Sequence, residues 1–403
     1  MTTATPLSDP EVPGLEILLG EGAEPLLGSF ADMAGDRVRS HRVSQIRYIP
    51  GRSVTVQYLA DTIDSRGKPG KSTYVASTIT DVPDDVPIFS AGDVEVAVWQ
   101  FPNDPYLPGL ASATDTDQAR KVLSQLGAEE SQISLRTRSY RPMRRAVIEA
   151  RGGAHSAFIK VTRPSQISRL QSIHVRLSES VPVPRSYGWD RHLGVVAMQA
   201  MPGRTLRRAL ERRSTSLPSA AQVISLLEML PRPDSSDRVI AGPVARASDH
   251  ARLLSIVDPE SSQQLGPILE ALDSVEVEPS TAAHGDFHSA QILVDKGQVV
   301  GLLDVDTVGV GERADDLAGL LGHLSTLALT SPARRDIERY GSKLIRGFDT
   351  AVDPVGLRLR VAGVVLGLAT GPFRVQERNW REATQARVRL ASDWIEASSS
   401  IRA

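Results

Sequence analysis

The stretch HGDFHSAQ, residues 284–291, gathers two histidines, an aspartate and a glutamine into eight positions. A carboxylate in a loop, such as Asp286, can accept a proton from a hydroxyl or help to hold a metal ion. His284 and His288 stand four residues apart, a spacing that aligns two metal ligands only on a helix, whereas Gly285 favours a loop here. We therefore expect Asp286, and not the histidine pair, to carry the chemistry.

A second carboxylate follows this loop. Asp304 ends the apolar run VVGLLD, and the end of a strand is where a rigid scaffold presents a functional side chain. Magnesium prefers oxygen ligands, usually one or two carboxylates together with substrate phosphates. Asp304 with the amide oxygen of Gln291 fits that set and leaves Asp286 as a base. Asp306 is either a further acidic neighbour of the metal or a solvated loop residue.

A lysine stands out in the first half of the chain. The sequence has six lysines among its 46 basic residues, and Lys160 is the one inside a strand-like run, SAFIKV. A chain that nearly always uses arginine has lysine there, which is suggestive of a specific role. The alternative is an edge residue whose stem covers apolar surface while its charge reaches water.

Helices and strands must position these residues. The expected elements are a helix at 14–35, a strand–turn–strand unit at 43–60, strands at 72–79 and 93–101, a helix at 117–126, strands at 133–140, 145–151 and 156–162, a helix at 165–179, and two strands in PVPRSYGW and LGVVAMQAM. From Gly203 onward the pattern is mostly helical, interrupted by HGDFHSAQ and by two short strand-like runs.

Two turns in the chain share a pattern of a tyrosine, a proline, an arginine and a small apolar residue at alternate positions. The matching residues are Tyr48, Pro50, Arg52 and Val54 in one turn, and Tyr140, Pro142, Arg144 and Ala146 in the other. A duplicated hairpin unit and a chance likeness between two turns both explain so short a match.

The bulk composition narrows the class of protein. A chain of 403 residues predicts two or three domains, and 41% hydrophobic with 23% charged residues is typical of globular proteins. The absence of cysteine excludes disulfides, zinc–thiolate sites and thiol nucleophiles. The net charge of −2 offers no basic field for nucleic acid. Without a signal peptide or an apolar run of about 18 residues, we expect a soluble cytoplasmic protein with no membrane partner.

The order of these residues resembles the aminoglycoside phosphotransferase-like family of small-molecule kinases, to which choline-kinase-type enzymes also belong. The likeness runs over residues 133–325 and rests on HGD at 284–286, an amide five residues later, an apolar strand ending in Asp304, and Asp316-Leu317-Ala318. The form HGDxHxxQ, with His288 and Gln291, is closest to the maltokinase and glucosamine-kinase branch.

The resemblance implies an α+β, protein-kinase-like two-lobed fold, with a small antiparallel β lobe and a large helical lobe. The N-terminal region would add an α/β cap. We expect the cap at residues 1–130, the small lobe and hinge at 131–202, and the helical lobe with the catalytic loop at 203–403.

The resemblance also implies transfer of a γ-phosphoryl group from ATP, or another NTP, with Mg²⁺, to a hydroxyl of a small molecule such as a sugar, aminosugar or aminoglycoside. Asp286 would orient and deprotonate that hydroxyl, and Lys160 would pair with the α- and β-phosphates. The other implied roles are magnesium binding by Gln291 and Asp304, phosphate contact by Arg144 and Arg145, adenine binding along the backbone from Gln199 to Met201, and support by His284, His288, Asp306 and Asp316.

Three departures from the family pattern leave a second hypothesis open. The helix after Lys160 has no glutamate to pair with it, because Glu179 falls too late and Gln166 or Gln171 is nearer the expected place. The chain also lacks a glycine-rich phosphate loop and has Gln291 where asparagine is usual. A pseudokinase that binds nucleotide or a partner is therefore the alternative. A metal-dependent phosphatase, read from GDFH or from DVDTV, is a weaker one.

Overall fold

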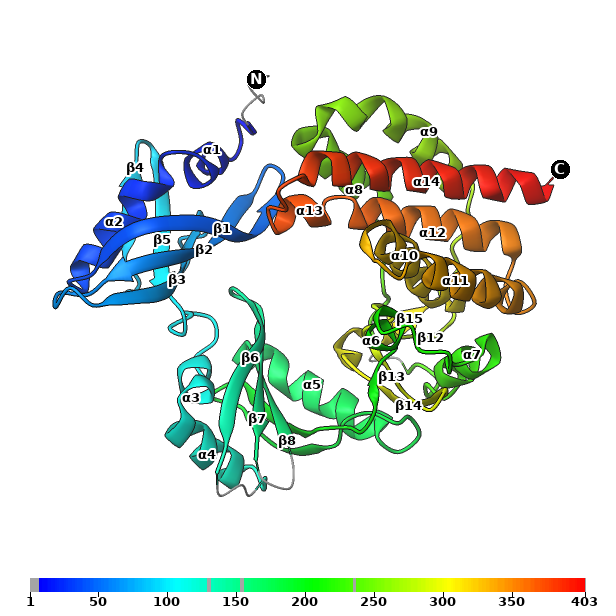
Figure 1. The fold of residues 1–403 in the computed structure, drawn as a ribbon, viewed down its shortest axis with the longest axis horizontal. Helices are drawn as coiled ribbons and strands as arrows, with labels where there is room; N and C mark the ends of the chain where they lie inside the picture. Colours follow the sequence, from blue (N-terminus) through cyan, green and yellow to red (C-terminus); the bar gives the residue numbers. More distant parts are fainter. Residues whose placement is uncertain (1–6, 129–131, 153–155, 235–236, 403) are drawn as a thin grey trace. The chain divides into compact units, whose positions relative to one another are not determined.

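A five-stranded antiparallel sheet follows two short helices at the start of the chain (Figure 1). Its strands pair in the order β1-β2-β3-β5-β4. The elements are α1 (Gly14–Leu19), α2 (Ala23–Met33), β1 (Arg37–Ile49), β2 (Ser53–Ile63), β3 (Pro69–Ser77), β4 (Ile88–Ala91) and β5 (Val94–Gln100). The single helix expected over 14–35 is wrong, because Gly20 takes an extended conformation and ends α1.

A second five-stranded sheet has the same architecture, with strand order β6-β7-β8-β10-β9. Two short helices again precede it, and one longer helix, α5, is inserted after its third strand. The elements are α3 (Leu110–Thr114), α4 (Thr116–Gln125), β6 (Ser134–Arg141), β7 (Arg145–Arg151), β8 (Ser156–Thr162), α5 (Pro164–Leu177), β9 (Ser186–Asp190) and β10 (Val195–Gln199).

The first hairpin is clasped by a buried aspartate from the segment before α1. Asp9 accepts hydrogen bonds from the Glu11 N–H at 3.0 Å, the Tyr48 hydroxyl at 2.5 Å and the Gly51 N–H at 2.9 Å. Gly51 has a φ of 68°. The carboxylate thereby satisfies the turn between β1 and β2.

The second hairpin has the same clasp at equivalent positions. Asp104, buried before α3, accepts from the Tyr106 N–H at 2.9 Å, the Tyr140 hydroxyl at 2.8 Å and the Met143 N–H at 2.7 Å. Met143 has a φ of 61°, so a residue with a side chain takes the left-handed conformation that Gly51 takes in the first turn. The shared strand order and the shared clasp confirm the duplicated hairpin unit.

Contacts divide the chain into two compact units. The first unit consists of Met1–Gln171, Ser186–Ala200 and Gly371–Trp380, and the second of Ser172–Arg185, Met201–Thr370 and Arg381–Ala403. The computed structural model describes residues 7–128, 132–152, 156–234 and 237–402. The boundary expected between residues 130 and 131 lies outside the described residues, and the division into cap, small lobe and large lobe stays a proposal.

The second sheet has two differently used faces. One face packs on α3 and α4 through Leu110, Leu123, Ile148 and their neighbours. The other face packs on α5, where Ile167 lies against Val196. Because neighbouring residues along a strand project to opposite faces, β10 serves both contacts, with Val195 and Ala197 toward α3 and α4 and with Val196 and Met198 toward α5.

The second unit is mainly helical, as expected. Its helices are α6 (Leu206–Glu211), α7 (Ala220–Glu228), α8 (Ala247–Val257), α9 (Ser262–Asp273), α10 (Arg313–Thr330), α11 (Arg334–Phe348), α12 (Pro354–Leu368) and most of α14 (Trp380–Arg402), while α13 (Gly371–Arg374) belongs to the first unit. Two small ladders complete it: β11 (Arg204–Thr205) with β13 (Ile292–Asp295) and β14 (Gln298–Leu302), and β12 (Thr281–Ala283) with β15 (Gly309–Gly311).

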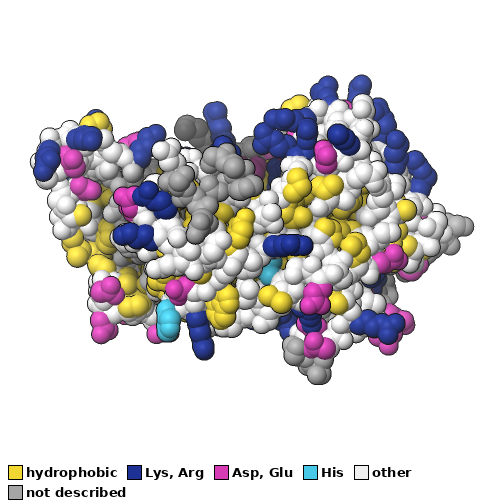
Figure 2. All heavy atoms as spheres, turned by 90° about the horizontal axis from the view of Figure 1, so that it is seen from below, with side chains coloured by type: hydrophobic (Ala, Val, Ile, Leu, Met, Phe, Trp, Pro, Cys, Tyr) yellow, Lys and Arg dark blue, Asp and Glu magenta, His cyan; other side chains and the backbone are white. Residues whose placement is uncertain are grey.

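One segment, Pro354–Arg374, is long and apolar enough to cross a membrane by length and composition, with a mean hydropathy of 1.3. The sequence analysis found no such run. In the structure 67% of the most apolar 18-residue stretch of this segment is buried. Within it, α12 supplies Leu357, Val361 and Val365 to the main hydrophobic core. Basic and acidic side chains are both spread over the face drawn in Figure 2, in keeping with the net charge.

Candidate active site

Lys160 lies in β8 with 4% of its surface exposed. It is paired with Val147 of β7 and with Val196 of β10, and directly paired residues project to the same face of a sheet. Because Val196 packs on Ile167 of α5, the Lys160 side chain lies on the α5 face. The strand therefore directs this ammonium group toward α5 and away from the core beneath α3 and α4.

The helix residue opposite this face is a glutamine. Glu179 follows the end of α5 at Leu177 and is exposed. Gln171 stands four residues after Ile167 and so lies on the same side of the helix. Its Oε1 is buried and has no hydrogen-bond partner among the residues that the structure describes. Gln166 is exposed, and its Oε1 accepts from the Thr162 hydroxyl at 3.1 Å.

The β6–β7 turn, residues 141–145, carries the two arginines expected to contact phosphate. Met143 anchors this turn, since its sulfur lies 3.8 Å from the hydroxyl of Thr55 and its carbonyl accepts from Arg163 Nε at 2.7 Å. Its side chain is buried with Val75, Ala97 and Trp99 of the first sheet. The first sheet thus holds the turn that displays Arg144 and Arg145.

Positive charge is concentrated around this turn. Desolvation by the surrounding chain, ahead of the charges of Arg47, Arg141, Arg145 and Arg163, lowers the pKa of Arg144 from its usual value. Guanidinium groups stay charged in proteins, so the cluster attracts an anion. Arginines thereby stand where a glycine-rich loop was expected from the family pattern.

The two hinge residues differ in their surroundings. Gln199 ends β10, where it pairs with Ala157 and is exposed. Met201 is partly buried and belongs to the second unit, where its sulfur lies against Gly301 of β14.

One buried carboxylate binds the backbone at the start of the loop at residues 284–291. Asp316, at the start of α10, accepts from the His284 N–H at 2.7 Å and the Gly285 N–H at 2.9 Å. Burial raises the pKa of Asp316, and these hydrogen bonds oppose that rise. The β12–β15 ladder brings the two segments together, since Ala283 pairs with Gly309.

The His284 side chain braces the same loop. It is fully buried, with Nε2 2.9 Å from the Leu303 carbonyl and Nδ1 accepting from the Asp286 N–H at 3.3 Å. These two bonds assign the ring proton to Nε2. His284 therefore orients the backbone of Asp286 and does not act as a base.

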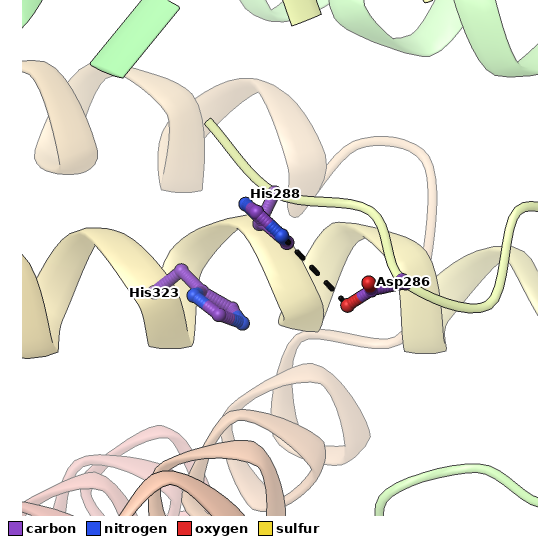
Figure 3. Close-up of side chains that lie close together, drawn as sticks. All are labelled: Asp286, His288 and His323. Carbon is purple, nitrogen blue, oxygen red and sulfur yellow. Dashed lines mark ion pairs between the residues drawn. The ribbon is translucent and has the colours of Figure 1, made fainter. Parts of the chain in front are cut away.

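Asp286 projects from this loop with 41% of its side chain exposed, so a substrate can reach it. Its Oδ1 lies 3.8 Å from Nε2 of His288 (Figure 3). The His288 ring stacks on the ring of His323 from α10, with centroids 4.3 Å apart. The sequence analysis missed His323, because nothing in a helical run reveals which face meets a loop some 35 residues earlier.

Gln291 and Asp304, the expected magnesium ligands, lie side by side. The β13–β14 hairpin pairs Ile292 with Leu302, which leaves both side chains at one end of the ladder. Gln291 Nε2 lies 3.5 Å from Asp304 Oδ2. The two residues offer the oxygen atoms that magnesium prefers, provided that the glutamine amide turns its oxygen toward the ion.

Asp304 has a strained backbone, with φ 54° and ψ 50°. Such left-handed residues other than glycine cost roughly 1–3 kcal/mol and cluster at functional sites. Asp306, two residues later, has its Oδ1 4.0 Å from Nε2 of His174. The sequence analysis did not predict this contact, and the two roles considered for Asp306 stay predictions.

The chain belongs to the phosphotransferase enzyme family, whose model matches residues 145–352. The match contains Lys160, the loop at 284–291, Asp304 and Asp316.

Comparisons with individual proteins agree with this family. An aminoglycoside 3'-phosphotransferase of Escherichia coli is 27% identical over 154 residues, which cover 35% of this chain and 56% of that relative. The fold is similar to that of aminoglycoside phosphotransferase APH(4)-Ia. A thermostable mutant in ternary complex with ADP and hygromycin B gives a TM-score of 0.51 at 14% identity, over 68% of this chain and 98% of the other. A complex with AMP-PNP and hygromycin B gives 0.50 at 14% identity, with the same coverage. The protein-kinase-like α+β fold is thereby confirmed.

Proposed function

We propose that this protein is a small-molecule kinase that transfers the γ-phosphoryl group of ATP to a hydroxyl of a sugar, aminosugar or aminoglycoside. The observation that carries the proposal is the geometry of one loop. Asp316 and His284 fix its backbone, Asp286 is presented half-exposed, and Gln291 stands beside Asp304. A rigidly held carboxylate next to oxygen ligands is what phosphoryl transfer to an alcohol requires.

In this reaction Asp286 accepts a hydrogen bond from the acceptor hydroxyl and takes its proton as the oxygen attacks the γ-phosphorus. The bond from the γ-phosphorus to the bridging oxygen of the β-phosphate breaks, and ADP leaves. Lys160 and the arginines of the β6–β7 turn bind the phosphate chain and hold it in place. Gln291 and Asp304 would hold magnesium, which neutralises charge on the phosphates when bound. A sugar-like acceptor is supported by the hygromycin B bound in the similar structures.

The test uses the Asp286→Asn variant of the full chain with ATP, magnesium and a panel of sugars and aminoglycosides. We expect transfer to fall about 10²- to 10⁴-fold, the usual contribution of a general base, while nucleotide binding persists. Asp295→Asn is the matched control, since Asp295 is an exposed aspartate at the end of β13. Transfer that survives in Asp286→Asn would show the base assignment to be wrong.

A pseudokinase remains the second candidate, and one observation favours it. The position on α5 that faces Lys160 holds the neutral Gln171, and Glu179 lies beyond the helix. An ion pair that activates kinases is therefore replaced by an amide. Nucleotide binding without transfer to any member of the acceptor panel would favour this candidate. Membership of the phosphotransferase family argues against the phosphatase alternative.

A further inference from the structure

Two histidines, to which the proposed reaction assigns no step, form a cluster with the proposed base. One suitable ligand atom each from Asp286, His288 and His323 lies within 4.8 Å of the other two (Figure 3). The loop supplies Asp286 and His288, and α10 supplies His323. All three side chains are partly buried, so the cluster is sheltered but open to solvent on one side.

We propose that Asp286, His288 and His323 form an inhibitory site for a transition-metal ion such as Zn²⁺, adjacent to the expected magnesium ligand Gln291, which contacts His288. Two imidazoles and one carboxylate suit zinc, cobalt, nickel and copper, whereas magnesium favours oxygen ligands alone. Three protein ligands with a fourth position left open is also a common zinc arrangement.

The distances are compatible with this assignment. Zinc ligands lie about 2.0–2.2 Å from the metal, so two of them at a tetrahedral angle are roughly 3.4 Å apart. Asp286 Oδ1 and His288 Nε2 are 3.8 Å apart. The rings of His288 and His323 are stacked with an interplanar angle of 19°, so metal binding requires them to turn until their nitrogen lone pairs converge. Rotation about the last side-chain bond of each histidine, which is a soft torsion, allows this.

His323 is partly buried. Burial, followed by the neighbouring charge of His288, lowers the pKa of His323 to about 3. Among the charged groups that act on His323, Asp286 favours a cation and Arg207 of α6 opposes it.

Ligation has two local costs. Nδ1 of His288 lies 3.2 Å from the Ala290 N–H and accepts from it, and Nε2 lies 3.3 Å from Gln291 Nε2. A metal on Nε2 displaces the Gln291 amide and moves the ring proton to Nδ1, so both contacts are given up. The consequence for function rests on the proposed kinase activity: an Asp286 oxygen bound to zinc cannot take the proton of an acceptor hydroxyl.

Binding is tested on the full chain, stripped of metal with a chelator, by titration with Co²⁺. A four-coordinate cobalt site absorbs visible light, so this readout needs no enzymatic activity. We expect one Co²⁺ per chain, displaced by Zn²⁺ but not by excess Mg²⁺. His323→Gln and His288→Gln should each weaken binding at least about tenfold, since loss of even an outer-shell partner costs about 10- to 100-fold. His192→Gln is the control, because His192 is exposed on the β9–β10 turn.

Two results would overturn the proposal: no saturable cobalt signal in the wild type, or a signal unchanged in both histidine variants. The activity arm is separate. Zn²⁺ should inhibit transfer by the wild type. The rate of each protein is compared with its own rate in chelator. By this measure, His323→Gln should need at least about ten times more Zn²⁺ for the same inhibition. If no acceptor is phosphorylated but the cobalt signal depends on His323, the metal site stands and the kinase proposal falls. Transfer that zinc leaves untouched would refute the inhibitory role.

Discussion

At the scale of single residues, an amide stands where the family pattern has a carboxylate, and the two groups differ in charge. Gln171 occupies the α5 position from which a carboxylate would reach the Lys160 face, and its buried Oε1 has no partner among the described residues. Burying an unsatisfied polar atom costs about 1–3 kcal/mol, so the position is tuned for something other than stability.

Changing Gln171 to Glu should therefore create an ion pair with Lys160. We expect kcat/KM for ATP to rise roughly tenfold, because a hydrogen bond between charged groups contributes about 1.5–3 kcal/mol. Steady-state kinetics of the purified variant measure the change. Gln166→Glu, at an exposed position on the same helix, should have no such effect. A fall in activity with loss of folded protein would mean that the new carboxylate is buried alone.

A second residue-scale prediction concerns pH. Burial raises the pKa of Asp315 to about 6, although Arg360 lies 3.2 Å away and opposes the shift. Since an unfolded aspartate has a pKa of about 3.9, the folded chain holds this proton more tightly. The contribution of Asp315 to the free energy of unfolding is therefore largest below pH 4 and is lost as the pH rises through 6.

Asp315→Asn removes this titration. The free energy of unfolding of the variant, relative to the wild type, should increase by about 3 kcal/mol between pH 4 and pH 7. Chemical denaturation of both proteins across that range measures the difference. A difference that stays constant with pH would show that the carboxyl group has an ordinary pKa in the folded chain.

At the scale of elements, the catalytic loop reaches α10 through a glycine. A Cβ on Gly319 would lie 2.7 Å from the Phe287 carbonyl oxygen, a contact that real side chains avoid. Gly319 therefore lets the loop carrying Asp286 and His288 lie directly on the helix that carries Asp316 and His323. The spacing between loop and helix sets the position of the base.

Gly319→Ala should displace the loop and reduce transfer, with a stability loss of about 1–3 kcal/mol from overpacking. Gly341→Ala in α11 is the matched control, because a Cβ there meets nothing within 4 Å. That variant should gain about 0.5–1 kcal/mol from higher helix propensity. Thermal melting and transfer rates of the two variants separate the effects; equal behaviour would mean that the loop tolerates the methyl group.

At the scale of the whole molecule, the first unit contains two copies of one architecture with different uses. Both sheets have the same strand order and the same aspartate clasp. The residue of β3 that pairs with β2 as Lys160 pairs with β7 is Ser77, so the first copy lacks the lysine. The first copy instead buries Met143 of the second and so supports its arginine turn.

Matched variants test whether only the second copy contributes to nucleotide binding. Asp9→Asn and Asp104→Asn remove equivalent clasps, and each should lower stability by about 1–3 kcal/mol through unsatisfied buried donors. Only Asp104→Asn should raise KM for ATP, by roughly tenfold, because only that clasp holds the turn with Arg144 and Arg145. Kinetics and thermal melting of both variants provide the comparison. Equal KM values in the two variants would argue that the β6–β7 turn does not contact the nucleotide.

Much of the fold was predictable because local patterns of apolar and turn-forming residues specify its strands and helices. Alternating apolar residues placed most strands, and a tyrosine–proline–arginine pattern revealed the duplicated hairpin. The single helix predicted over 14–35 is wrong because Gly20 takes an extended backbone conformation and ends α1. The amino-acid composition of the segment does not predict that conformation. The apolar segment Pro354–Arg374 was missed because its arginines interrupt the run of apolar residues, although the core buries most of it.

By itself the sequence determined the kinds of chemistry present: a loop carboxylate, an amide and a strand-end aspartate in order, a lysine within an apolar strand, and no thiol. Only the tertiary structure decided their neighbours. It stacked His323 on His288, placed Asp306 beside His174, put Lys160 on the sheet face that packs on α5, and buried Met143 against the first sheet. Residue types and spacings are local properties of the chain, whereas these contacts join segments far apart in sequence and arise only when helices and sheets pack.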